Sequence, residues 1–174
     1  MTGNTGGRSP SPRGEAMVRE LKWVHDMLRR DLQVVRQLAA GVQDGVPAAQ
    51  VRAGLRSLAT RGPLWQLRVN CLQYCQIVHT HHGLESALLF PALRAANPAL
   101  GPVVDKLEAD HQQVSGLLED VEAAAGDLAG QDSPQARQRL STALTALSTD
   151  LLAHLAFEEE NVADTMRTMN GWPW

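Results

Sequence analysis

The feature that most constrains this chain is a histidine followed four residues later by a glutamate, which occurs twice. His81 precedes Glu85, and His154 precedes Glu158. Four residues along an α-helix bring two side chains onto the same face, one turn apart. Each pair lies within an apolar stripe, where an ionised glutamate is costly to bury without a compensating charge. The spacing therefore predicts two helices whose buried faces carry ligands for a cation.

Apolar side chains recur at intervals of three and four residues in four long segments, which is the pattern of helices with one buried face. Gly-Pro precedes one of these segments and Ser-Pro another, and proline is favoured in the first turn of a helix. The pattern predicts an all-α helix bundle. We expect the long helices at about 14–40, 63–90, 102–125 and 134–169, with Pro91 kinking or tightening the end of the second.

The remaining segments are expected to surround this bundle. A short extra helix is predicted at about 48–60, between the first and second long helices, where it would pack on the bundle. Residues 1–13 are rich in Gly, Ser and Pro, which predicts a disordered N-terminal tail. Residues 170–174 contain Gly and Pro and predict a short C-terminal tail. A chain of 174 residues needs one domain, which we place at 14–169.

Composition argues against several classes of partner. The net charge is only -3 and no basic block of the kind that binds nucleic acid is present. No apolar run approaches the roughly 20 residues needed to span a membrane, and the first residues lack the apolar core of a secretory signal. Cys71 and Cys75 lie within one predicted helix, a poor spacing for a disulfide, so we expect reduced thiols and a cytoplasmic protein.

Two more histidines, His25 and His111, fall within the apolar stripes of the other two long helices. A single buried histidine is usually a core residue, hydrogen-bonded to a backbone carbonyl or a hydroxyl. Four histidines and two glutamates, each near the middle of a stripe, are better explained together by a bound cation. Because imidazole and carboxylate ligands suit iron or manganese, and two carboxylates can bridge, the sequence predicts a pair of metal ions.

The rotation of a helix, about 100° per residue, sorts the polar neighbours of these residues. His82 is expected at the rim of the site, as an additional ligand or a hydrogen-bond donor to one. His79, Glu159 and Glu160 are expected to turn away towards solvent. Tyr74 shares the face of His81 two turns away, where a core tyrosine with a hydrogen-bonded hydroxyl is expected.

At these residues the chain resembles the hemerythrin-like family of HHE cation-binding domains, and the resemblance covers roughly 14–169. The stretch 81–91, His-His-Gly-Leu-Glu-Ser-Ala-Leu-Leu-Phe-Pro, resembles the signature of that family's second helix. Val24-His25-Asp26, Asp110-His111 and His154-Leu155-Ala156-Phe157-Glu158-Glu159 resemble the motifs of the first, third and fourth helices. The overall sequence, with Tyr74-Cys75 just upstream, is most similar to those of actinobacterial members of the family.

The resemblance implies an up-and-down four-helix bundle with a non-haem di-iron centre. It further implies two iron ions with a bridging oxo or hydroxo group, and bridging roles for Glu85 and Glu158. Oxygen-carrying members have a second histidine in the third helix where this chain has Ser115, and many relatives have an acid at Ser86. One iron is therefore expected to hold fewer protein ligands and more water, or to recruit His82. The terminal ligands implied by the resemblance are His25, His81, His111 and His154.

The expected function is to bind or react with O2 or peroxide. The coordination positions on iron that no protein ligand fills argue against simple oxygen carriage. One alternative is a di-iron oxidase or oxygenase acting on a small organic substrate. Another is an iron or redox sensor without turnover, and manganese or zinc are alternative metals. Ferritin-like chemistry is prompted by Glu108, three residues before His111, but that fold requires a second such pair, which is missing.

Overall fold

The computed structural model describes residues 9–44 and 63–173. The described chain is almost entirely helical and contains no strand. The predicted helix at 48–60 and most of the predicted N-terminal tail lie outside the described residues. The helices are α1 (Pro12–Gln43), α3 (Pro63–Leu84), η1 (Glu85–Leu89), α4 (Phe90–Ala96), η2 (Pro98–Leu100), α5 (Gly101–Gly130) and α6 (Pro134–Arg167).

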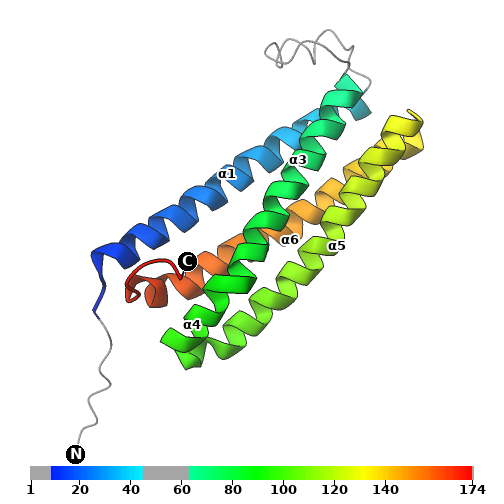
Figure 1. The fold of residues 1–174 in the computed structure, drawn as a ribbon. Coiled ribbons are helices and arrows are strands. Elements are labelled where there is room, and N and C mark those ends of the chain that lie inside the picture. The colour runs from blue at the N-terminus through cyan, green and yellow to red at the C-terminus, as the bar shows by residue number, and fades with distance from the viewer. Residues whose placement is uncertain (1–8, 45–62, 174) are drawn as a thin grey trace, which may run out of the picture.

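The long helices α1, α3, α5 and α6 lie side by side and alternate in direction, which confirms the predicted up-and-down bundle (Figure 1). α1 packs against α3 and α6, and α5 packs against the same two helices. Each helix therefore faces two neighbours and a shared interior. Ser133 caps α6 by accepting a hydrogen bond from the Ala136 N–H at 3.2 Å, and Pro134 occupies its first turn as expected.

The interior contains two apolar clusters at different heights along the bundle. One is centred on Leu32, Val78 and Leu118, and it extends along all four long helices. The other is centred on Phe90 and Leu107 and joins the start of α1 to the end of α6. Between the two clusters lies a set of buried or nearly buried ionisable side chains, which we call the polar layer: His25, His81, His82, Glu85, His111, His154 and Glu158.

The second long helix does not tighten at Pro91. Instead, residues Glu85–Leu89 form a wider π-helical turn, in which the Phe90 N–H donates to the Glu85 carbonyl. Proline has no N–H and its ring crowds the preceding turn. The wider turn immediately before Pro91 accommodates both effects and allows the helix to continue as α4. Since Glu85 begins this turn, the irregularity lies directly at the polar layer. Such π-turns are often found at functional sites.

The connection between α5 and α6 is shorter than predicted. We expected the third long helix to end at about residue 125, whereas α5 continues to Gly130. Ala125 and Leu128 are buried in the larger apolar cluster, and that packing outweighs the low helix propensity of Gly126.

Among the described helices, α6 is long and apolar enough to pass for a membrane-crossing segment, contrary to our expectation from the sequence. Core helices of soluble proteins share this property. The buried face of α6 packs against α1 and α5 and carries His154 and Glu158. Part of its apolar character is therefore used for packing inside the bundle.

Candidate metal centre

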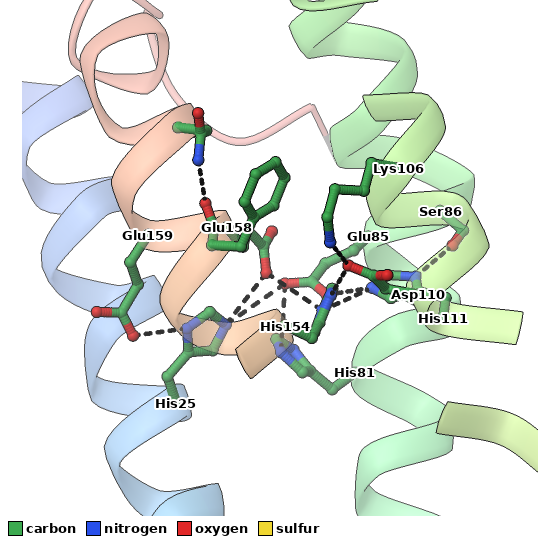
Figure 2. A network of polar contacts seen from close by, with 12 residues as sticks. His25, His81, Glu85, Ser86, Lys106, Asp110, His111, His154, Glu158 and Glu159 are labelled. Carbon is green, nitrogen blue, oxygen red and sulfur yellow. Dashed lines mark hydrogen bonds and ion pairs between the residues drawn. The ribbon is translucent and has the colours of Figure 1, made fainter. Parts of the chain in front are cut away.

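Side chains from all four long helices meet in the polar layer (Figure 2). α1 contributes His25, the end of α3 contributes His81 and His82, and η1 begins with Glu85. The contributions of α5 and α6 are His111, His154 and Glu158. The structure thus brings together all six residues of the predicted site, with His82 added.

The ligand atoms fall into two groups that share a carboxylate. His82, Glu85, His111 and His154 each offer one atom, and these atoms lie within 4.8 Å of one another. His25, His81 and Glu85 form a second group by the same measure. The arrangement has the form of two adjacent cation sites with Glu85 between them.

The two oxygens of Glu85 are turned towards different groups. Oε1 lies 3.3 Å from His81 Nε2 and 3.9 Å from His25 Nε2. Oε2 lies 3.5 Å from His111 Nε2. A carboxylate held in this way can contact two cations, one through each oxygen.

Glu158 also reaches both groups. Its Oε2 lies 3.4 Å from His25 Nε2 and 3.8 Å from His154 Nε2. His25 belongs to one group of ligands and His154 to the other. The repeated His-then-Glu spacing therefore places both carboxylates within reach of both groups.

Many polar atoms of the layer have no hydrogen-bond partner among the described residues. They include both oxygens of Glu85 and Glu158, and the Nε2 atoms of three histidines: His25, His81 and His82. Each such buried group costs roughly 1–3 kcal/mol if it stays unpaired. His111 Nε2 and His154 Nε2 face each other at 3.1 Å. Oxygen and imidazole nitrogen atoms that are unpaired and converge in this way fit iron or another transition-metal cation.

Burial is the main cause that lowers the pKa of every histidine in the layer. The pKa falls to about 3 for His25, His81 and His111, and to about 4 for His154. Near neutral pH the imidazoles are therefore uncharged and carry a lone pair, which is the form that binds metals.

The pKa values of the two glutamates are shifted in the opposite direction. Burial, and then the neighbouring Glu158 carboxylate, raise the pKa of Glu85 well above its usual value. Burial, and then the charge of Glu159, raise the pKa of Glu158. Each carboxylate thus favours the protonated form until a positive charge arrives. A cation bound between them would stabilise the ionised form and release protons.

Two of the histidines have a hydrogen-bond partner at the ring nitrogen that faces away from the layer. His25 Nδ1 lies 2.9 Å from Glu159 Oε1, and His111 Nδ1 lies 2.8 Å from Ser86 Oγ. His154 Nδ1 lies 3.8 Å from Asp110 Oδ2, which is too long for a hydrogen bond. The hydrogen-bond partners of His25 and His111 orient these two rings behind the candidate ligand atoms.

The prediction that Glu159 turns towards solvent is wrong. Its side chain is only 18% exposed and contacts both His25 and Arg29 of α1. Rotation about α6 shows that Glu159 points away from His154, but it does not reveal that α1 packs on that flank. Glu160 is exposed, as expected.

His82 lies deeper than the rim position predicted for it. It is only 6% exposed, and its ring stacks on that of His111 at a centroid distance of 4.0 Å. His79 is half-buried and belongs to neither group of ligands in the described chain. His79 and His82 line a groove of about 440 Å³ between α3 and α5, together with Ser86, His111 and Ser115.

The other residues singled out in the sequence lie in the larger apolar cluster. Tyr74 is buried, and its hydroxyl has no hydrogen-bond partner among the described residues, contrary to expectation. Cys71 and Cys75 are buried free thiols, and burial raises the pKa of both to about 12. Thiols in that state are weak nucleophiles and poor metal ligands.

Comparison with known proteins identifies one relationship. A family model described as the hemerythrin HHE cation binding domain matches residues 17–165, a range that contains every residue of the polar layer. No curated protein and no solved structure matches the chain.

Proposed function

The chain belongs to the hemerythrin family of HHE cation-binding domains, and from that premise we propose that it is a di-iron protein that reacts with O2 or peroxide. The observation that carries this proposal is the convergence of unpartnered oxygen and nitrogen atoms in the polar layer. A buried set of this kind has no evident role in stability, since each unpaired atom opposes folding.

The two groups of ligand atoms suggest how the ions would be shared. His25 and His81 would hold one ion, and His82, His111 and His154 the other. Glu85 and Glu158 would contact both. In this arrangement His82 takes the place of the third-helix histidine that is absent at Ser115. Manganese or zinc could occupy the same ligands.

Bound iron would supply redox chemistry and exchangeable positions for a small oxidant. The protein's own residues would hold the ions. The neutral imidazoles would donate lone pairs, and the carboxylates would keep two positive charges close together. Apolar clusters border the layer on either side along the bundle.

A second candidate function, di-iron oxidation of a small organic substrate, is favoured by one observation. The groove of about 440 Å³ between α3 and α5 has His82 and His111 in its lining. It is large enough for a small molecule, and its other lining groups include hydroxyls and an amide. Turnover that depends on one compound would distinguish this function from reaction with the oxidant alone.

The proposed setting is the cytoplasm, without a nucleic-acid or membrane partner. The mild net charge of -3 and the two free, buried cysteines support it.

Metal analysis of the purified protein, together with optical spectra before and after addition of O2 or peroxide, tests the main proposal. We expect two iron ions per chain and a spectrum that changes on oxidation. A protein that binds no iron, or whose iron spectrum is unchanged by both oxidants, would contradict it.

A further inference from the structure

The two ring nitrogens of His25 lie in different surroundings. The residue is fully buried. Its Nε2 has no hydrogen-bond partner among the described residues and faces Glu158 and Glu85. Its Nδ1 lies 2.9 Å from Glu159 Oε1 (Figure 2). Since an ionised carboxylate only accepts hydrogen bonds, Nδ1 carries the proton and Nε2 keeps its lone pair for the polar layer.

Glu159 is itself held in place. Arg29, one turn after His25 on α1, donates from Nη2 to the same Oε1 at 2.7 Å. Its Nη1 donates to Asp26 at 3.1 Å. The guanidinium pairs with Glu159 and restricts its rotation, so the carboxylate bridges α6 to α1 beside the candidate ligand.

The other histidines lack a partner of this kind. The neighbour of His111 at Nδ1 is the neutral Ser86 hydroxyl. The carboxylate nearest to His154 Nδ1, that of Asp110, lies at 3.8 Å and is also paired with Lys106. Of the described histidines in the layer, His25 thus has the closest contact between a ring N–H and a carboxylate. A carboxylate that accepts a hydrogen bond from the ring nitrogen facing away from a metal makes the imidazole a stronger electron-pair donor to that metal.

We infer that Glu159, clamped by Arg29, is a positioning residue that selects the tautomer of His25 and strengthens its bond to one of the two ions. This inference rests on the proposed function and deepens it, because it makes the two metal sites unequal for an electrostatic reason. The ion held by His25 and His81 depends on Glu159, whereas the ion held by His82, His111 and His154 does not.

The test uses three variants of the full-length protein. Glu159→Ala removes both the acceptor and the charge, whereas Glu159→Gln keeps an acceptor and removes the charge. Glu160→Gln is the matched control, since it makes the same charge change at the next, exposed position of α6. Cobalt(II) titration of the metal-free proteins, in competition with a chromophoric chelator, measures the affinity of each site. Nitrogen-15 NMR of the imidazoles reports the tautomer of His25 without any metal.

We expect the wild-type protein and Glu160→Gln to bind two cobalt ions with the same affinities. Glu159→Ala should weaken one site by roughly 10–100-fold and leave the other unchanged, and Glu159→Gln should weaken the same site by less. The NMR signal of His25 should show Nδ1 protonated in the wild type and a mixture of tautomers in Glu159→Ala.

Equal affinities in all four proteins, with the same His25 tautomer, would overturn the inference. Equal weakening of both sites would also overturn it, because that result indicates a general structural defect. If the wild-type protein binds fewer than two cobalt ions, it is the di-metal proposal that fails. The tautomer measurement would then still decide the role of Glu159.

Discussion

Replacing Glu158 with methionine should make the metal-free protein more stable. The Glu158 side chain is 0% exposed, and neither of its oxygens has a hydrogen-bond partner among the described residues. A buried polar group left unpaired costs roughly 1–3 kcal/mol. Methionine is unbranched and of similar length, so it can fill the same space without that penalty. We expect the free energy of unfolding of the metal-free protein to rise by about 1–3 kcal/mol.

Each kcal/mol corresponds to roughly 2–4 °C in the melting temperature of a chain of this size. Thermal and urea unfolding of both proteins, after treatment with a chelator, measure the change. The same variant should lose most of the stabilisation that added iron(II) or cobalt(II) gives the wild type, because a cation that binds the folded state stabilises it. The two effects have opposite signs, so a general change in packing cannot produce both.

Glu160→Met, at the exposed neighbouring position, is the control and should have little effect on either measurement. A metal-free Glu158→Met protein that is less stable than the wild type would refute the reasoning. It would mean that the carboxylate has a stabilising partner in the absence of metal. The unpaired atoms of the layer would then no longer indicate a cation.

Three further outcomes are expected. His81→Ala should lose much of the bound metal, whereas His79→Ala, which lies outside both groups of ligands, should keep it. Elemental analysis of the two purified variants measures their metal content. The metal-free protein should lose stability as the pH falls from about 6.5 towards 5. In the unfolded chain the histidines of the layer take up protons at their usual pKa, whereas the fold holds the pKa of four of them at about 3 to 4. The raised pKa of the two glutamates acts in the opposite sense, but five histidines outnumber them, and urea unfolding across this pH range gives the net slope. Gly14→Ala should lower the melting temperature, because a Cβ there would lie 2.2 Å from a backbone oxygen of α6, whereas Gly116→Ala, which meets nothing within 4 Å, should raise it slightly.

The sequence predicted relations within a helix better than relations between helices. The His-then-Glu spacing depends only on helix geometry, and the structure indeed points both members of each pair into the layer. The apolar stripes of α1 and α5 likewise located His25 and His111 correctly. Whether those residues bind metal stays a prediction.

The errors arose where a second helix decides the outcome. Glu159 meets Arg29 only because α1 packs on that flank of α6. His82 is buried because α5 brings the His111 ring onto it. The rotation of residues about the axis of one helix does not show which side chains a neighbouring helix brings against Glu159 or His82. The π-turn at Glu85–Leu89 was also missed, since the position of Pro91 signals a disturbance but not its form.

The position of the polar layer between two apolar clusters explains how the chain tolerates so many unpaired groups. Buried apolar side chains stabilise a fold by roughly 1.5–3 kcal/mol each, and both clusters join all four sides of the bundle. The clusters can therefore hold the helices in register on either side of the layer, even while its ligand atoms repel or remain unpaired. If the clusters hold the layer in place in this way, a bound ion meets ligands already positioned for it. The binding energy is then available for holding the ions rather than for ordering the chain.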